Sequence, residues 1–304
     1  MKERIFRFGE NLSMVGILTE PTQDKLLPNS PIAIMLNAGI VHRVGPFRLH
    51  VELARSLAEA GIRSLRIDLS GLGDNPTRSS KSTLEEVALE DGLWAMDALE
   101  KQTGVGRFTV IGLCSGAYHA QRFACMDSRV VGAVFLDGIA FPTPQHCKRL
   151  AKKLWNVRFW RNAVKRRWLK LMPIDSAQSA GAKLAETQFF GSNLTREESA
   201  RQLKQLVSKG VRMLFVYTGG NPDFSSSLQF EEMFGVAAND SLQVEYYSNA
   251  EHTFPLVKSR QRLVGRMVEF SLEPQLGNKP STKHINFARI QSDCDSSPVS
   301  AAPP

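Results

Sequence analysis

Short apolar runs alternate along this chain with amphipathic segments of helical period. Strands are predicted at "RIFRF", "MVGILT", "IAIMLN", "RSLRIDL", "RFTVIGL", "VVGAVFLD", "VRMLFVYT" and "LQVEYYS". The third to the seventh are apolar along most of their length, as expected of strands covered on both faces. Strands that alternate with helices indicate a mainly parallel sheet with helices on both faces. The first two runs leave no room for a helix between them, so they predict an antiparallel hairpin at one edge.

Three segments between the apolar runs carry helix signals. The segment 46–61 has apolar residues at helical spacing and ends at a glycine. The segment 82–101 opens with Ser82 and Glu85, and 195–210 opens with Thr195 and Glu198. A serine or threonine followed three residues later by glutamate is the capping-box pattern of a helix start. We therefore expect a helix in each segment.

The chain is expected to form one α/β domain over residues 1–272, with an eight-stranded sheet. The hydrophobic fraction of 42% is ample for a large core. Residues 141–205 interrupt the alternation with a helical, basic stretch, which we interpret as an inserted lid. Residues 273–304 are polar and rich in proline and serine, and predict a disordered C-terminal tail.

The sequence indicates a soluble, cytoplasmic protein. Its first residues lack the apolar run of a signal peptide, and no stretch reaches about 18 uninterrupted apolar residues. The four cysteines form no C-x-x-C pair and no framework spacing. This distribution argues against structural zinc and against a disulfide scaffold, and we expect no metal site.

The run "GLCSGA" places two nucleophilic side chains side by side after a predicted strand. A nucleophile on a sharp strand-to-helix turn needs small residues two positions before and after it. If Cys114 is the nucleophile, those positions are Gly112 and Gly116; if Ser115 is the nucleophile, they include a leucine. The pattern therefore favours Cys114 and keeps Ser115 as the alternative nucleophile. A structural cysteine before an ordinary glycine turn remains a third interpretation.

The position of Cys114 also suits its chemistry. A helix N-terminus stabilises a thiolate, and the backbone N–H of the residue after the nucleophile, Ser115, is expected to donate to an oxyanion. A second donor is expected from the loop "LNAGIVHRVGP", where Gly39 and Ile40 lie at the turn toward the nucleophile. Arg43 in this loop has either a structural role or a place at the pocket rim.

A base and an acid are expected after the last two strands. His252 lies in "AEHTF" after the final run, and Asp223 lies in "TGGNPDF" after the run before it. The order nucleophile, acid, histidine is that of a nucleophile-elbow triad. Asp137, in "FLDG" after the sixth run, is the alternative acid. Two histidines within predicted helices, His50 and His119, are interpreted as structural, and so is the carboxylate of Asp68, which we expect to order its loop.

These motifs together resemble the α/β-hydrolase superfamily, in its lipase, esterase and serine-aminopeptidase-like branch. The resemblance rests on "LNAGIVHRVGPFRLHVELARSLAEAGIRSLRIDLSGLGDN", "GLCSGA" and "AEHTF", and it covers about residues 3–271. The first loop is most similar to hydrolases of bacterial exopolysaccharide and natural-product gene clusters. Most members carry serine at the nucleophile position, whereas dienelactone-hydrolase-like enzymes and polyhydroxyalkanoate synthases carry G-x-C-x-G. The resemblance implies acyl chemistry and leaves peptidase activity in doubt.

The positive charge of the chain is concentrated in one segment. The formal net charge is +8, and the residues between Asp137 and Asp175 include ten Lys or Arg and no acid. Residues 148–170 also hold three of the four tryptophans. Four interpretations stay open: a solvated helix face, an anionic lipid surface met by a peripheral protein, an anionic acyl carrier or coenzyme A, and nucleic acid. No nucleic-acid recognition motif accompanies the charge, which disfavours the last.

The motifs predict an esterase or thioesterase that forms a covalent acyl-enzyme on Cys114, His252 and Asp223. Such a triad with backbone donors needs no cofactor. A thioester is also readily passed to an acceptor other than water, so an acyltransferase with the same triad is the first alternative. A non-catalytic hydrolase-fold scaffold that docks through its basic segment is the second.

Overall fold

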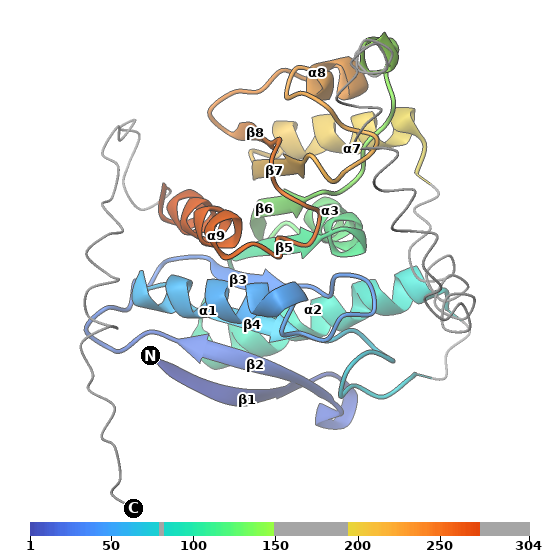
Figure 1. Ribbon diagram of the computed structural model, residues 1–304. Helices are drawn as coiled ribbons and strands as arrows, with labels where there is room; N and C mark the ends of the chain where they lie inside the picture. The colour runs from blue at the N-terminus through green and yellow to red at the C-terminus, as the bar shows by residue number, and fades with distance from the viewer. Residues whose placement is uncertain (79–81, 149–193, 274–304) are drawn as a thin grey trace, which may run out of the picture.

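A sheet of eight strands lies at the centre of the computed structural model, which describes residues 1–78, 82–148 and 194–273 (Figure 1). The strand order is β1-β2-β4-β3-β5-β6-β7-β8. All neighbours from β4 to β8 are parallel, whereas β2 is antiparallel to both β1 and β4. The strands are β1 (Lys2–Phe8), β2 (Met14–Glu20), β3 (Ile32–Met35), β4 (Ser64–Ile67), β5 (Phe108–Leu113), β6 (Val130–Leu136), β7 (Arg212–Thr218) and β8 (Leu242–Tyr247). The predicted eight-stranded, mainly parallel sheet and its edge hairpin are confirmed.

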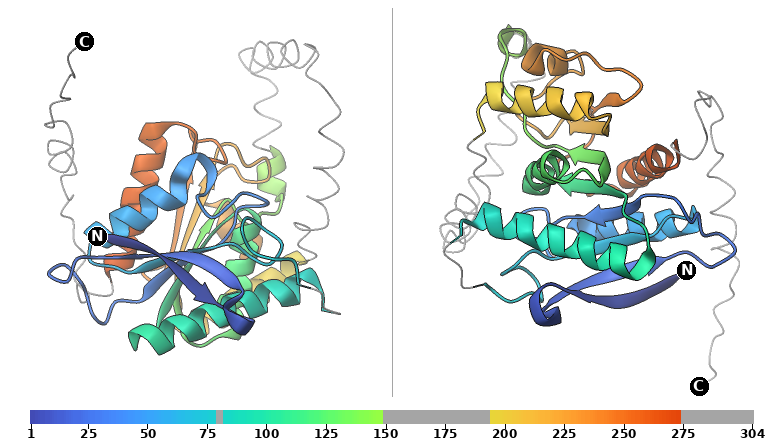
Figure 2. Two further views of the ribbon diagram at one scale, coloured as in Figure 1. Left: turned by 90° about the horizontal axis from the view of Figure 1, so that it is seen from below. Right: turned by 180° about the vertical axis from the view of Figure 1, so that it is seen from behind.

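Helices cover both faces of this sheet. One face carries α1 (Leu49–Glu59) and α9 (Val257–Leu272), and the other carries α2 (Leu84–Thr103), α3 (Ser115–Met126) and α7 (Arg196–Ser208) (Figure 2). Two separate apolar clusters fill the layers, and β5 supplies Val110 to one and Ile111 to the other. Neighbouring side chains on a strand point to opposite faces, so an apolar run without polar interruptions serves both layers.

The three predicted helices are present, with one shift in a cap. The helix in 82–101 begins one residue later than its predicted cap, because Thr83 and Glu86 form the capping box in place of Ser82 and Glu85. Both pairs have the same spacing, so the sequence pattern could not separate them. For α7 the predicted cap is found, since the Thr195 side chain accepts from the backbone N–H of Glu198. The remaining helical elements are α8 (Gln229–Phe234), η1 (Glu10–Leu12) and η2 (Pro46–Arg48).

Most of the predicted lid and tail lies outside the described residues. This holds for the basic segment 148–170 beyond its first residue and for the tail 273–304 beyond its first residue. The described end of the predicted 141–205 insertion belongs to α7, whose Leu203 and Leu206 are buried in the core against α3. α7 is thus part of the layer that covers the sheet, and the bounds of the inserted lid stay a prediction.

No helix in the described ranges is long and apolar enough to cross a membrane. Within the same ranges, Cys114, Cys125 and Cys147 are free thiols.

The strands bring the predicted site residues to one edge of the sheet. Five parallel strands, β3, β5, β6, β7 and β8, all end on the same side. The loops that follow them carry Gly39, Cys114, Asp137, Asp223 and His252. The carboxyl ends of parallel strands are where open α/β sheets bind ligands.

Candidate active site

Cys114 occupies a strained turn between β5 and α3. Its backbone has φ 58° and ψ −119°, a conformation that costs free energy for a residue with a side chain. The side chain is exposed. A Cβ built on Gly112 would lie 2.0 Å from the carbonyl oxygen of Gly116, and one built on Gly116 would lie 2.4 Å from that of Asn37. The sharp turn therefore requires glycine on both sides, as the pattern G-x-C-x-G predicts.

Because the backbone approaches so closely at Gly116, a side chain at this position should destabilise the protein. We expect Gly116→Ala to lower the free energy of unfolding by at least about 3 kcal/mol, because a backbone atom must move to admit the methyl group. Gly104→Ala is the control: φ is +72° and nothing lies within 4 Å, so only left-handed strain of about 1–2 kcal/mol applies. Urea unfolding measures both. Equal losses would contradict the requirement for close approach at the turn.

His252 contacts Asp137, the acid that follows β6. The imidazole Nδ1 lies 3.0 Å from the Asp137 carboxylate, and the side chain of Asp137 is fully buried. That carboxylate also accepts from Thr218 at the end of β7, through the backbone N–H at 2.7 Å and through the hydroxyl group. Three donors thus converge on one buried carboxylate. Such a set of donors fixes the orientation of the carboxylate.

Asp223, the acid favoured by the sequence, does not occupy this position. Its backbone N–H donates to Asn221 and its carbonyl accepts from Gln229, while no hydrogen bond of its carboxylate is found within the described ranges. The next residue, Phe224, is buried and stacks on the Tyr217 ring, with centroids 3.8 Å apart. This packing directs the loop after β7 into the core layer. The expectation that Asp223 contacts the histidine is therefore wrong, and the alternative, Asp137, is the residue that does.

The environment of His252 favours its protonated form. The hydrogen bond to Asp137 raises its pKa to about 10, with a second contribution from a hydrogen bond to Cys114, against an opposing effect of burial. The imidazole therefore lies between the exposed thiol and the buried carboxylate. At neutral pH it carries a proton that it can deliver toward a group bound at Cys114.

The loop after β3 contacts the residue after Cys114. The Gly39 N–H donates to the Ser115 hydroxyl at 2.9 Å, and the turn is closed by a hydrogen bond from Val41 N–H to the Ala38 carbonyl. The N–H group of Gly39, one of the predicted oxyanion donors, therefore already donates to the Ser115 side chain. Within the described part of the chain, no hydrogen bond is found for the N–H groups of Ile40 and Ser115, which leaves both available to a ligand.

Asp68 orders the same loop, as the sequence indicates. It is fully buried and accepts from Asn37, from the backbone N–H of Arg43 and from the Arg43 guanidinium, which also pairs with Asp74. Arg43 is buried and therefore structural. Ligand atoms of His42, Asp68 and Asp74 lie within 4.8 Å of one another, a spacing that a cation could use. Because Arg43 already lies between the two carboxylates, its charge opposes that of a metal ion there.

Two features of this site were not predicted from the sequence. One is Thr218, which holds the Asp137 carboxylate; a threonine before two glycines at a strand end is the only local signal for it. The other is the histidine His119 on α3, interpreted above as structural, which lines a cavity next to Ser115.

Most of the chain matches one protein family. Residues 38–264 match the model of the "Alpha/beta hydrolase family". The chain belongs to this family. The predicted superfamily is thereby confirmed, and this family member is a hydrolase by fold and family.

Solved structures support the same fold at low sequence identity. The α/β hydrolase GrgF from a Penicillium species has a TM-score of 0.57 and 14% identity, covering 90% of this chain and 99% of its own. Est1E from Butyrivibrio proteoclasticus has a TM-score of 0.55 and 14% identity, covering 88% and 98%. A dienelactone hydrolase from Anabaena variabilis has a TM-score of 0.54 and 13% identity, covering 90% and 99%. No curated protein matches this hydrolase.

Proposed function

We propose that this hydrolase cleaves an ester or thioester through an acyl-enzyme on Cys114, with His252 as the acid–base group and Asp137 as the carboxylate that orients it. The observation that carries the proposal is the contact of one imidazole with both a strained, exposed cysteine and a buried carboxylate. A nucleophile, a base and an orienting acid in this relation are the parts of a nucleophilic triad.

The first half of the reaction acylates the cysteine. The Cys114 sulfur attacks the carbonyl carbon, and the electron pair of the C=O bond moves to its oxygen. The N–H groups of Ile40 and Ser115 donate to this oxyanion. When the C=O bond re-forms, the bond to the leaving alcohol or thiol breaks. The leaving group takes a proton from His252, and a thioester remains on the enzyme.

The second half releases the acid. Water attacks the thioester carbonyl and passes a proton to His252, the carbon–sulfur bond breaks, and the sulfur regains its negative charge beside the imidazolium. Asp137 keeps the histidine in the tautomer and orientation that both steps need. No residue of this scheme requires a cofactor.

An acyltransferase is the second candidate, and the cysteine is the feature that favours it. A thioester reacts readily with an alcohol, amine or thiol acceptor in place of water. We expect a hydrolase to keep its product distribution when such an acceptor is added. A transferase would instead form the acyl-acceptor product faster than the free acid.

The concentration of cations in residues 148–170 supports a further part of this proposal, an anionic partner such as a lipid surface or an acyl carrier. These residues lie outside the described ranges apart from the first.

The test of the proposed function compares two exposed thiols. Iodoacetamide should alkylate Cys114 faster than Cys147, which is also exposed but has no contact with His252. It should react still more slowly with Cys125, because burial raises the pKa of that thiol. Mass spectrometry of tryptic peptides gives the rates, and activity should be lost in step with alkylation of Cys114.

A chromogenic acyl ester completes the test. We expect a burst of one equivalent of alcohol per enzyme, followed by slower turnover, because deacylation follows a covalent step. The intact mass should rise by one acyl group on Cys114. Equal alkylation of Cys114 and Cys147 together with no burst would favour the non-catalytic scaffold.

A further inference from the structure

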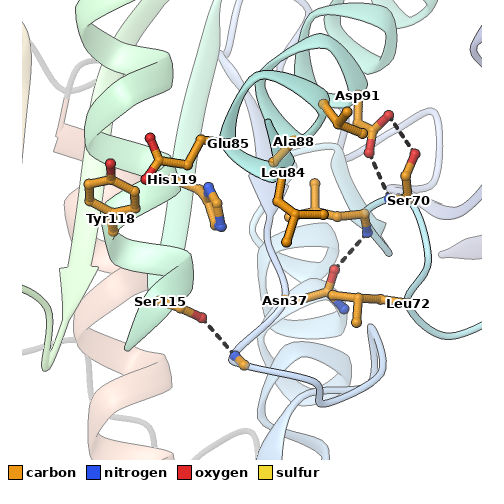
Figure 3. A pocket seen from close by; sticks show the side chains of 13 residues that line it. Asn37, Ser70, Leu72, Leu84, Glu85, Ala88, Asp91, Ser115, Tyr118 and His119 are labelled. Atoms are coloured by element: carbon orange, nitrogen blue, oxygen red, sulfur yellow. Dashed lines mark hydrogen bonds between the residues drawn. The ribbon is translucent and has the colours of Figure 1, made fainter. Parts of the chain in front are cut away.

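A cavity lies next to Ser115, the residue that follows Cys114, between α2 and α3 and the loops after β3 and β4. It is partly open to solvent and encloses a volume of about 50 Å³. Gly39 and Ser115, which flank the proposed oxyanion position, form one end of it. Most of the side chains across from α3 are apolar, and these are Leu69, Leu72, Leu84, Val87 and Ala88. Leu72, Leu84 and Ala88 are labelled in Figure 3. Any group bound at Cys114 therefore has an apolar space beside it.

The strand order indicates which part of a substrate enters this cavity. Its lining comes from α2, from α3 and from the loops after β3 and β4. Asp137 and His252 follow β6 and β8, on the opposite side of the strand that carries Cys114. The leaving group must receive its proton from the histidine, so it lies on the histidine side. The cavity is left for the acyl group.

The charged residues of the cavity wall are already paired. Glu85 accepts from Arg122 at 2.6 Å. Asp91 is fully buried and accepts from Arg78 at 2.8 Å and from Ser70. An acyl group that carried its own charge would meet no unpaired counter-charge here. The lining thus suits a neutral group.

His119 is the exception to the apolar and paired lining. Its imidazole is directed from α3 toward Leu84 across the cavity (Figure 3). No hydrogen bond of its ring is found in the described part of the chain. Burial, aided by the charge of Arg122, lowers its pKa to about 4, so the ring is neutral at pH 7. A neutral imidazole has one donor and one acceptor, and inside a cavity both favour a partner.

We propose that this cavity binds the acyl group of the substrate, and that His119 hydrogen-bonds a neutral polar substituent, such as a hydroxyl group, on that acyl chain. The proposal rests on the proposed function, because it assigns one half of the substrate of the same site. It makes α2 and α3 the elements that set acyl specificity. The substrate class is a neutral, mainly apolar acyl group with one hydrogen-bonding substituent.

The first experiment measures kcat/KM for a series of 4-nitrophenyl esters from acetate to decanoate. We expect kcat/KM to rise roughly fourfold per added methylene until the cavity is filled. Ala88→Phe should shorten the preferred chain, because it narrows the cavity from α2. Ala98→Phe is the matched control on the same helix, since Ala98 does not line the cavity. Leu84→Ala, at a half-exposed position that can be changed with little effect on folding, should lower the gain from longer chains.

The second experiment compares hexanoate esters with and without a hydroxyl group at successive carbons. We expect His119→Phe to lower the ratio of kcat/KM for the preferred hydroxyhexanoate to kcat/KM for hexanoate roughly tenfold. An equal effect on both esters would overturn the role of His119. If Ala88→Phe and Leu84→Ala both leave the preferred chain length unchanged, the cavity is not the acyl site. The proposed function would still stand in that case, provided that the acetate ester acylates Cys114. Failure of every ester to acylate Cys114 would overturn the proposed function, and this proposal with it.

Discussion

Replacing Cys114 with alanine should lower kcat for an acyl ester by on the order of 10⁵-fold or more. The alanine variant has no sulfur to form the thioester, and knockout of a triad nucleophile costs about that much in related chemistry. Stopped-flow and steady-state hydrolysis should show neither burst nor turnover above the rate without enzyme. Thermal unfolding checks that the variant is folded; alanine keeps the Cβ, so the backbone strain at φ 58° is the same in both proteins.

Ser115→Ala is the matched variant at the neighbouring position. It keeps the backbone N–H that is proposed to donate to the oxyanion. It removes only the hydroxyl that accepts from Gly39. We therefore expect a loss of roughly tenfold or less, from a less ordered loop. An inactive Ser115→Ala together with an active Cys114→Ala would reverse the assignment and make Ser115 the nucleophile.

Asp137→Asn should lower kcat by about 10⁴-fold, because an amide cannot hold the imidazole in the required tautomer. Asp223→Asn is the control at the other candidate acid, and its effect should stay below about threefold, since that carboxylate does not contact the histidine. Steady-state hydrolysis of one ester by both variants decides between them. The reverse ranking would mean that the loop after β7 changes its position when substrate binds and brings Asp223 to the histidine.

The pH dependence of the same variants gives an independent measurement. The pKa of His252 is raised to about 10 in the wild type, chiefly by Asp137 and then by Cys114. Proton delivery to the leaving group uses the imidazolium, so the alkaline limb of kcat/KM should lie near pH 10. In Asp137→Asn it should move down toward the ordinary value of 6.5. An unchanged limb in that variant would contradict the assigned contact.

The contact between His252 and Asp137 also stabilises the folded protein, by an amount that depends on pH. The folded-state pKa of His252 lies above its unfolded value, so the contribution is fully present below about pH 6.5 and is lost as the pH rises toward 10. The difference in unfolding free energy between wild type and Asp137→Asn should shrink over that interval.

Patterns along the chain were sufficient to predict the sheet, most of its helices and the strained turn. Each of these depends on residues a few positions apart: runs that fill two layers, a threonine three residues before a glutamate, and glycines two positions from Cys114. The steric demand is local, and the distances of 2.0 Å and 2.4 Å at the two glycines show how little space the turn leaves. The sequence pattern does not distinguish a cap at Ser82 from one at Thr83, because each residue is followed by a glutamate three positions later.

The partners of the site depend on contacts between distant strands, and spacing along the chain does not encode them. Asp137 and Asp223 both follow a strand at the correct edge of the sheet. Only packing distinguishes them: Thr218 from the adjacent strand donates to Asp137, whereas burial of Phe224 against the core directs the other loop into a helix layer. The cavity beside Ser115 arises in the same way, from two helices and two loops that meet only after folding. The sequence thus determined which chemical groups reach this edge, and the tertiary contacts decided which of them meet, because side-chain contacts across a sheet depend on strand order and loop packing.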